Sequence, residues 1–445
     1  MSDNKGAVKD NTNDNSPDAP TSLPPPAKKI KAGIIDQDSL TSKPIILIVG
    51  AGFGGLGTAR QLIKNGGTQK FHIILLDSRD YFTIGGLWQF VWNGRLPTMD
   101  VVRFPLRDAQ LEGIDLRTRT SVQHWQPQHQ TVELDDGSIL SYQHLVLACG
   151  VLSDPTSIPG IENHVNICSE DMVPQQGKEL QQLIAKAKTE KVTFVLGISF
   201  YPYKCPPAPF EITFLVDEAL RNANVRDNVR MCMTCPVDWP MPPATKQPFL
   251  DELKGRNIEF ISDRVMDKVE GNTIHFESGH CLDFTTLWSV WPIRVPDFVK
   301  EAIPLNSSGF VTVEDKVINS IPNVPNSYVI GDCCTVPYGP SGDCFALPKA
   351  GEFAWRMAES VADALVDDRK PANRKGECVA EAGFNKGLVL KQNLSDVCND
   401  PVSGLPEVKV GTTNKGTDIK IGWVNRYLKE IFGDRVKPFE LNGTR

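Results

Sequence analysis

The sequence has no long apolar run, no concentrated basic segment and no arginine within its first 43 residues. A helix needs about 18 consecutive apolar residues to cross a bilayer, so no transmembrane helix is expected. The formal net charge is −7, which argues against nucleic acid as the main partner. An arginine-free start with several aspartates fits neither a transit peptide nor a signal peptide.

What the sequence does contain is typical of an ordinary globular protein, with 445 residues, 40% of them hydrophobic and 23% charged. That length allows two or three domains, each with its own core. Residues 1–43 are polar and proline-rich without apolar periodicity, which predicts a disordered tail. The eleven cysteines are an odd number and cannot all be paired. They indicate a reducing, intracellular compartment, where a disulfide would be catalytic.

A glycine-rich turn lies near the start of the ordered chain. The segment "IILIVGAGFGGLGTARQLIK" predicts a strand at 45–49, a tight turn and a helix ending at about residue 64. Gly50, Gly52 and Gly55 fit the pattern G-x-G-x-x-G, in which they permit the turn, the approach of a pyrophosphate and close helix–strand packing. The next strand, "FHIILLD", ends in Asp77, whose carboxylate is placed to accept bonds from a ribose. The sequence therefore predicts a dinucleotide site.

Two later segments specify the nucleotide. "YQHLVLACG" resembles the strand that closes the FAD domain in the two-dinucleotide-domain flavoprotein superfamily, and "NSYVIGDCC" resembles the late FAD motif of that superfamily. The resemblance implies FAD as cofactor, with Cys149, Gly150 and Gly331 beside it and Asp332 bonded to a ribityl hydroxyl. Cys149 stands where the superfamily usually has threonine, and Asp77 stands where glutamate is commoner.

A second nucleotide-type unit is predicted at 191–291, but its first turn has changed. We expect strands at 192–196 and 229–235, helices at about 209–220 and 248–254, and a β meander ending at about 291. The turn "GISFYPYKCPP" keeps one glycine and has three prolines. Prolines fix φ and remove N–H donors, so this turn cannot form the ring of amides that a pyrophosphate needs. Electrons from a nicotinamide cofactor are therefore not expected here.

Cys205, in the same turn, is a candidate electron donor. It lies just before a helix start, where the helix dipole favours a thiolate, and beside Lys204, which acts in the same direction. From this position a thiolate with a low pKa is expected. The alternative is an inert buried thiol in a proline loop.

The segment "YPYKCPPAPFE" resembles the active-site segment of sulfide:quinone oxidoreductases and flavocytochrome c sulfide dehydrogenase. The resemblance implies that Cys205 is one of a redox pair on the flavin and that Glu211 lies near the site. "GDCFALPKAGEFAWRMAESVADAL" resembles the "PK-x-G" helix of that family, whose lysine, here Lys349, stabilises the reduced flavin. "CVAEAG" and "GWVNRYLKEIF" also fit, so the resemblance covers about residues 43–432.

The second cysteine of the pair is less clear. We predict Cys344, four residues before Pro348, because the chain there is expected to run over the flavin. Cys333 and Cys334 are the alternatives and are expected to have packing roles. Some family members attach flavin covalently through a cysteine near the end of the second strand. "DSRDYFTIGGLWQFVWNGR" has none, so FAD is expected to be non-covalent.

Two further patterns carry weaker signals. "CMTC", Cys232 to Cys235, has dithiol spacing but lies in a predicted strand, where the two side chains point to opposite faces. No metal site is expected there. The segment 421–432 predicts an amphipathic helix. It either packs on the protein or, as the family resemblance implies, contacts a membrane near a quinone channel.

Together these patterns predict an α/β protein with two Rossmann-like domains. We expect FAD to be bound by residues 44–158 and 292–368, a second nucleotide-type domain at 159–291, and a C-terminal region at 369–445. The predicted function is oxidation of sulfide, or of a related thiol or persulfide, with Glu211 handling protons and quinone accepting the electrons. The alternatives are a type II NAD(P)H:quinone reductase and an FAD-binding redox sensor. We expect an intracellular protein, associated with a mitochondrial inner or bacterial cytoplasmic membrane if it contacts one.

Overall fold

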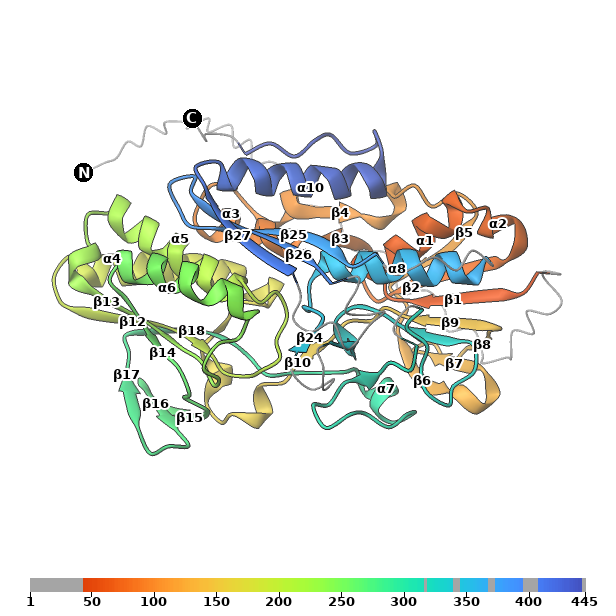
Figure 1. Ribbon diagram of the computed structural model, residues 1–445, viewed down its shortest axis with the longest axis horizontal. Coiled ribbons are helices and arrows are strands. Elements are labelled where there is room, and N and C mark those ends of the chain that lie inside the picture. The colour runs from red at the N-terminus through yellow and green to blue at the C-terminus, as the bar shows by residue number, and fades with distance from the viewer. Residues whose placement is uncertain (1–42, 316–317, 339–344, 367–372, 395–406, 442–445) are drawn as a thin grey trace, which may run out of the picture.

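The protein consists of two parallel β-sheets lying side by side, with a C-terminal segment across one of them (Figure 1). The computed structural model describes residues 43–315, 318–338, 345–366, 373–394 and 407–441. The predicted disordered tail lies outside these residues except for Lys43. The fold class predicted from the sequence, α/β with two Rossmann-like units, is confirmed.

The first sheet contains the glycine turn. Its five strands are all parallel and follow the order β21 (Ser327–Val329), β9 (His144–Leu147), β1 (Ile45–Val49), β2 (His72–Asp77) and β5 (Ile114–Thr118). All five residues of β1 are buried, because helices and loops cover both faces of the sheet. The late segment "NSYVIGDCC" thus joins the same sheet as the glycine turn, although it lies far away in the sequence.

Two long helices lie against each other beside this sheet (Figure 1). They are α1 (Phe53–Lys64), which begins at the glycine turn, and α8 (Gly351–Leu365), which follows the segment of Lys349. The helix α1 buries Leu56, Ala59 and Leu62, three residues apart, on the side that faces the core. The strand at 45–49 and the helix end at residue 64 agree with the sequence prediction.

The second sheet repeats the plan of the first. Its parallel strands follow the order β11 (Val165–Asn166), β18 (Thr286–Val290), β12 (Val192–Ile198), β13 (Val229–Thr234) and β14 (Ile258–Ile261). Its helices are α4 (Val173–Ala187), α5 (Ala208–Asn222) and α6 (Lys246–Gly255). The predicted strands and helices of this unit are present, with ends that differ by one or two residues.

Each unit also carries an antiparallel three-stranded meander. The first comprises β6 (Val122–Gln126), β7 (Thr131–Leu134) and β8 (Ile139–Ser141), and the second comprises β15 (Met266–Glu270), β16 (Thr273–Phe276) and β17 (Cys281–Asp283). Four neighbouring strands and the meander recur in both halves, whereas the edge strand comes last in the first sheet (β21) and first in the second (β11).

The C-terminal segment adds a third layer. It contains a three-stranded antiparallel sheet of β25 (Lys375–Glu381), β26 (Gly387–Asn393) and β27 (Glu407–Thr413), followed by helix α10 (Gly416–Phe432). Short elements between the larger ones include β3 (Tyr81–Thr83), α3 (Trp88–Trp92), β4 (Arg103–Pro105) and α7 (Asp297–Lys300). Within the described residues, no helix combines the length and apolarity that a membrane crossing requires.

Candidate active site

The glycine turn has the steric features that its sequence predicts. Gly50 has a φ of 103°, and a Cβ on it would lie 2.5 Å from the carbonyl oxygen of Ala148. A Cβ on Gly55 would lie only 1.7 Å from the carbonyl oxygen of Gly50, so strand and helix pack without room for a side chain. Gly52 faces open space, since a Cβ on it would have no neighbouring atom within 4 Å. This open face is where a phosphate can approach the backbone.

Asp77, at the end of β2, fixes the conformation of this turn. Its carboxylate accepts hydrogen bonds from the backbone N–H groups of Ala51, at 2.6 Å, and Arg79, at 2.8 Å. On the other side of the turn, Gly150 follows β9 with a φ of 65° and also faces open space. Cys149 is half-buried beside it, and the hydrogen bond of the Cys333 thiol to Cys149, together with burial, raises the pKa of Cys333. The predicted ribose and flavin contacts of these residues stay predictions.

Lys349 is hydrogen-bonded to the backbone of the predicted late FAD motif. Its ammonium group donates hydrogen bonds to the carbonyl oxygens of Asp332, at 2.6 Å, and Cys334, at 2.9 Å, and lies 3.6 Å from the ring centroid of Phe310. Burial lowers the pKa of Lys349, and the nearby Asp332 opposes that shift. Burial raises the pKa of Asp332 in turn. Gly331, before Asp332, has a φ of 78°. The structure thus places a desolvated cation directly beside Gly331 and Asp332.

The cysteine turn meets this same segment. The backbone N–H of Cys205 donates to the carbonyl oxygen of Lys349 at 2.6 Å, and Lys204 and Lys349 form an isolated parallel β-bridge. The "PYKCPP" turn of the second unit is therefore hydrogen-bonded to the "PK-x-G" segment of the first. The two segments that carry the family resemblance, far apart in the sequence, come together in the fold.

The predicted low pKa of Cys205 is wrong. Burial, followed by the effect of the nearby Cys168, raises the pKa of this thiol to about 11. Lys420 and the backbone N–H of Ala208 lower the pKa but do not outweigh the loss of solvation. Burial raises the pKa of Cys168 and of Asp332, and the charge of Lys204 opposes both shifts.

The Cys205 side chain is nevertheless accessible to solvent. Every cysteine that the structure describes is a free thiol. Cys205 interacts electrostatically with the thiols of Cys168 and Cys378, so both thiols lie in its neighbourhood.

The predicted partner Cys344 lies outside the described residues. The alternatives Cys333 and Cys334 are buried, and their thiols donate to the carbonyl oxygens of Ile330 and Gly331. These contacts agree with the packing roles expected for them. Cys168, which the sequence analysis did not predict as a site residue, is one of the thiols near Cys205.

The turn before α5 does not provide a phosphate site. The amide of Ala208, the first residue of α5, already donates to the carbonyl oxygen of Cys205 at 2.9 Å, and Pro209 has no N–H. Tyr203 is buried within the turn and donates its hydroxyl hydrogen to the carbonyl oxygen of Pro206. The amides of Cys205 and Ala208 are thus already used, and the prolines of this turn supply none.

Glu211, in the first turn of α5, belongs to a buried polar cluster. It forms an ion pair with Lys420 of α10 and accepts a hydrogen bond from the side-chain amide of Gln89 at 2.7 Å. The same Gln89 amide donates to Glu381 of β25. The sequence prediction included only Glu211. Lys420 lies four residues before the buried Val424, and a lysine on the apolar face of a helix is a signal that could have identified it.

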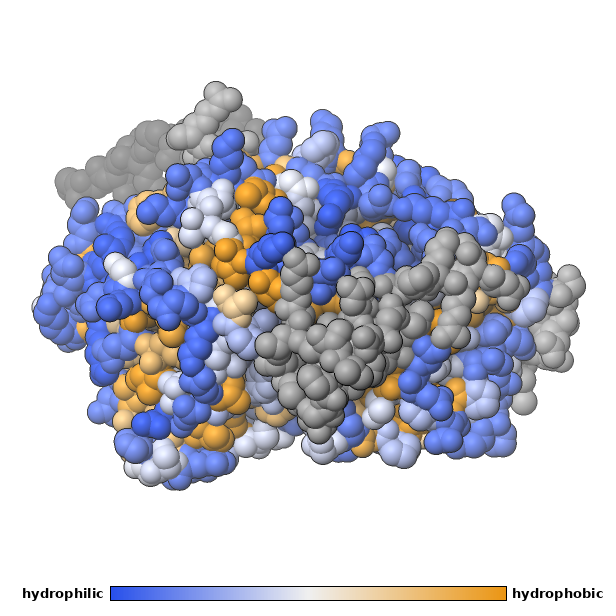
Figure 2. All heavy atoms as spheres, in the orientation of Figure 1, coloured by the Kyte–Doolittle hydropathy of each residue, from blue (hydrophilic) through white to orange (hydrophobic). Residues whose placement is uncertain are grey.

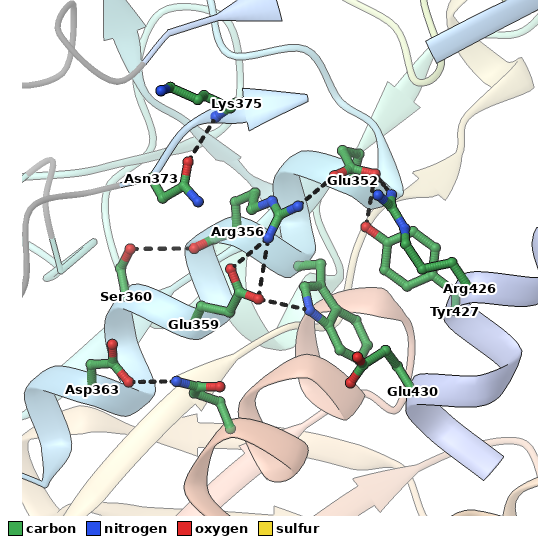
Figure 3. Close-up of polar contacts among 12 residues, drawn as sticks. Glu352, Arg356, Glu359, Ser360, Asp363, Asn373, Lys375, Arg426, Tyr427 and Glu430 are labelled. Atoms are coloured by element: carbon green, nitrogen blue, oxygen red, sulfur yellow. Dashed lines mark hydrogen bonds and ion pairs between the residues drawn. The ribbon is translucent and has the colours of Figure 1, made fainter. Parts of the chain in front are cut away.

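The helix α10 is fixed to α8 by a second buried carboxylate. Figure 3 shows Arg356, Arg426 and Tyr427 converging on Glu352, in the first turn of α8. The Tyr427 hydroxyl donates to Glu352 at 2.8 Å, and the indole N–H of Trp423 donates to it at 2.8 Å as well. Three α10 side chains thus bind a residue that lies three positions after Lys349.

Aromatic packing joins the same helix to the glycine turn. The ring of Phe53, the first residue of α1, lies 5.0 Å from that of Tyr427 and 5.7 Å from that of Trp423. Gly351 leaves room for it, since a Cβ there would lie 2.5 Å from the Phe53 ring. The C-terminal helix therefore covers the start of both helices that flank the predicted FAD site.

The apolar face of α10 packs against the interior of the protein. Val424, Leu428 and Ile431 are buried, whereas Arg426 and Lys429 are exposed. Figure 2 shows hydrophilic residues along the top of the molecule, where Figure 1 draws this helix. These observations favour core packing over the membrane-contact alternative for this face.

The cysteines of "CMTC" are packed inside the protein. Cys232 and Cys235 are both buried, and they belong to two different hydrophobic clusters, as expected for side chains on opposite faces. Burial raises the pKa of each to about 12. Among the residues that the structure describes, no group of three or more histidine, cysteine or acidic side chains is arranged to hold a metal ion.

The site as a whole fits a flavin dinucleotide. Gly52 and Gly150 leave backbone open to a ligand, Lys349 supplies a buried cation, and the backbone N–H of the accessible Cys205 is hydrogen-bonded to Lys349. Such a backbone cradle is suited to a pyrophosphate, and the cation is suited to a ring that becomes anionic on reduction.

Comparisons with known proteins find similar oxidoreductases. Residues 44–196 match the model of the pyridine nucleotide-disulphide oxidoreductase family. A mitochondrial sulfide:quinone oxidoreductase from Dictyostelium discoideum is 25% identical over 66% of this chain and 66% of its own length. Type II NADH:quinone oxidoreductases from Staphylococcus aureus are 23% identical over 71% of this chain and 80% of theirs.

The structural similarity extends over most of the chain. The crystal structure of the sulfide:quinone oxidoreductase from Aquifex aeolicus superposes with a TM-score of 0.72, at 19% identity, covering 90% of this chain and 97% of that one. The fold is therefore shared along almost the whole length of both proteins. Together with the sequence matches, it shows that the chain is similar to FAD-dependent oxidoreductases, among them sulfide:quinone oxidoreductases.

Proposed function

We propose that this protein oxidises sulfide, or a related low-molecular thiol or persulfide, and transfers the electrons through FAD to a quinone. The observation that carries the proposal is the hydrogen bond from the Cys205 N–H to the Lys349 carbonyl oxygen. It brings an accessible thiol to the segment whose lysine is expected to face the flavin. We also propose that FAD is bound without a covalent bond, by residues 44–158 and 292–368.

The proposed chemistry begins at a disulfide between Cys205 and its predicted partner Cys344. Sulfide attacks one sulfur, so the disulfide bond breaks, a new sulfur–sulfur bond forms as a persulfide on one cysteine, and the other cysteine leaves as a thiolate. Bound FAD supplies two-electron chemistry, which connects oxidation of the sulfur to reduction of the quinone. Oxidation of one hydrosulfide ion to sulfane sulfur releases two electrons and one proton, and the quinone takes up two electrons and two protons.

The surrounding residues stabilise charge and move protons. Lys349, already desolvated, would stabilise negative charge on the pyrimidine side of the flavin. Asp77 and Gly50, Gly52 and Gly55 would hold the nucleotide, with Cys149, Gly150, Gly331 and Asp332 along its length. Glu211, buried at the start of α5, would exchange the protons.

One alternative has a specific observation in its favour. The Staphylococcus relatives are named type II NADH:quinone oxidoreductases, and they match the chain at nearly the same identity as the sulfide enzyme. The amides of the turn before α5 argue against it, because a nicotinamide dinucleotide needs a phosphate cradle there. A flavoprotein that senses redox state without turnover is a third possibility.

Reduction of the bound flavin under anaerobic conditions separates these functions. We expect stopped-flow absorbance to show rapid flavin bleaching by sulfide, little bleaching by NADH, and reoxidation on addition of a soluble quinone. Rapid bleaching by NADH and none by sulfide would establish the alternative. Bleaching by sulfide without reoxidation by quinone would favour the sensor.

Quinone as a substrate places the enzyme at a membrane. The Dictyostelium relative is described as mitochondrial. We propose peripheral contact with a quinone-containing membrane, by a surface other than the buried apolar face of α10. Sedimentation with quinone-containing vesicles tests this contact. A protein that stays in the supernatant at low salt would contradict the proposed membrane contact.

A further inference from the structure

The second antiparallel meander carries a row of polar side chains across its three strands. Lys268 of β15 is paired in the strand register with His275 of β16, and His275 is paired with Cys281 of β17. Residues paired in neighbouring strands point to the same face of a sheet, so these three side chains lie side by side. Glu270, two residues after Lys268 on β15, adds a carboxylate to the same face.

The opposite face of this meander packs into the protein. Val269, Ile274 and Leu282, which neighbour these polar residues along the chain, are buried in one hydrophobic cluster. Cys281 is exposed, and 30% of the His275 side chain is accessible. A slip of one residue in the register would bury the polar side chains and expose the apolar ones. The packing therefore holds the thiol and the imidazole on the solvent side.

The thiol, the imidazole and the carboxylate are in contact with one another. The Sγ of Cys281 lies 3.4 Å from the Nδ1 of His275, and the Nε2 of the same ring lies 3.2 Å from Oε2 of Glu270. The ammonium group of Lys268 donates to the other carboxylate oxygen, Oε1, at 2.9 Å. With its proton on Nε2 facing Glu270, the imidazole can accept a proton at Nδ1. A nucleophile that contacts a base, with the base oriented by a third group, is the arrangement by which proteins activate a thiol.

The first meander has the same shape without this set of residues. There His124 of β6 is paired with Glu133 of β7, Glu133 is paired with Ile139 of β8, and the first strand of each meander has a register shift at the corresponding place. Isoleucine thus stands in the place of the thiol, and a carboxylate stands in the place of the imidazole. The meander fold therefore does not require the thiol, imidazole and carboxylate of the second unit.

We propose that Cys281 is a modification site, at which a low-molecular disulfide forms a mixed disulfide with the protein. His275 takes the proton of the Cys281 thiol at Nδ1, and the thiolate attacks one sulfur of the disulfide. A new sulfur–sulfur bond forms, the original one breaks, and the leaving thiolate receives the proton from His275. The protein thiol is oxidised and half of the disulfide is reduced, so no other oxidant is needed. Glu270 and Lys268 are positioning residues, because they orient the imidazole.

The modification needs neither the flavin nor Cys205, so it stands apart from sulfide oxidation. The charged side chains that face the imidazole are Lys268 and Glu270 of β15, with Asp283 two residues after Cys281 on β17. Asp283 accepts a hydrogen bond from the Thr273 hydroxyl at 2.6 Å. The base at the thiol is therefore His275, and its removal should slow the reaction of Cys281 alone.

The test is the rate at which glutathione disulfide modifies Cys281 in the reduced holoprotein, followed by mass spectrometry of the peptide that contains it. For His275→Gln we expect the rate to fall about tenfold at neutral pH, because the thiol then ionises only through solvent. His280→Gln is the matched control. This exposed histidine contacts Ser278 through its ring, at 3.1 Å, and its loss should leave the rate unchanged. Glu270→Gln should slow the reaction by a smaller factor.

The pH profile separates loss of the base from a structural effect. The rates of wild type and His275→Gln should converge at high pH, where the thiol ionises without assistance, whereas a change in exposure would lower the rate at every pH. Thermal unfolding and flavin content check that the variants are folded. A folded His275→Gln protein that reacts at the wild-type rate at neutral pH would overturn the proposal, and so would the absence of an adduct on Cys281 in the wild type.

Discussion

The two parallel sheets of this protein begin with turns of opposite chemistry. After β1, residues 50–52 form a short turn whose backbone is open at Gly52. After β12, residues 199–207 form a longer turn in which prolines and Tyr203 occupy the space and Cys205 is the accessible group. The same scaffold thus presents amides in one half and a thiol in the other.

The comparison shows how a dinucleotide architecture can change its substrate. The order of four neighbouring strands and the meander are alike in both halves, so the fold of each unit does not depend on the ligand. The two halves differ in the hydrogen-bond donors that follow β1 and β12. The bond from Cys205 to Lys349 then directs the altered turn of the second unit toward the predicted cofactor of the first.

The largest effect is expected where the first turn is tightest. Gly55→Ala places a Cβ 1.7 Å from the Gly50 carbonyl oxygen, and we expect it to destabilise the fold by about 3 kcal/mol or to prevent folding. Gly52→Ala is the matched control, because its Cβ meets nothing and its φ of −81° suits alanine. It should fold with reduced flavin content. Thermal unfolding and the flavin-to-protein absorbance ratio measure both outcomes, and equal stability of the two variants would contradict the steric argument.

A large kinetic effect is expected at the segment where the two halves meet. Lys349→Met removes the buried cation, and we expect flavin reduction to slow by about a hundredfold, the scale found for loss of one charge-stabilising donor. Lys204→Met, at the neighbouring position of the β-bridge, should reduce the rate much less. Stopped-flow absorbance with sulfide gives the rates. Similar rates in the two variants would mean that Lys349 does not face the flavin.

A smaller and more selective effect concerns the thiols of the second unit. Burial raises the pKa of Cys205 to about 11, so its thiolate fraction, and with it the labelling rate, should rise about tenfold per pH unit below that value. Cys232 and Cys235 lie in hydrophobic clusters and should stay unlabelled while the protein is folded. Mass spectrometry after iodoacetamide treatment distinguishes the three. If Cys232 were labelled as fast as Cys205, solvent accessibility would not explain which thiols react.

Much of this architecture was predictable because the signals are local. The glycine spacing at Gly50, Gly52 and Gly55 requires a strand–turn–helix, and the structure has it at the predicted residues. The three prolines near Cys205 likewise exclude a phosphate cradle before any coordinates are considered. Backbone conformation and missing donors depend on residue type and are visible in the sequence.

The electrostatics of the site was not predictable in the same way. The dipole of α5 and Lys204 predicted an acidic Cys205, whereas burial raises the pKa of the thiol, and the lysine that opposes this shift, Lys420, belongs to α10. Neither the degree of desolvation nor the approach of Lys420 can be derived from neighbours in sequence, because both depend on how the C-terminal segment packs. The pairing of Cys205 with Lys349 across the two units has the same origin.

The most direct test of the central claim is anaerobic titration of the bound flavin with sulfide, in wild type and in Cys205→Ser. Absorbance of the oxidised flavin reports the electrons received. The account predicts bleaching of the wild type by about one equivalent of a two-electron donor, and none in the variant, with dithionite bleaching both as a control. Equal bleaching of the two proteins by sulfide would show that electrons reach the flavin without Cys205, and would contradict the account.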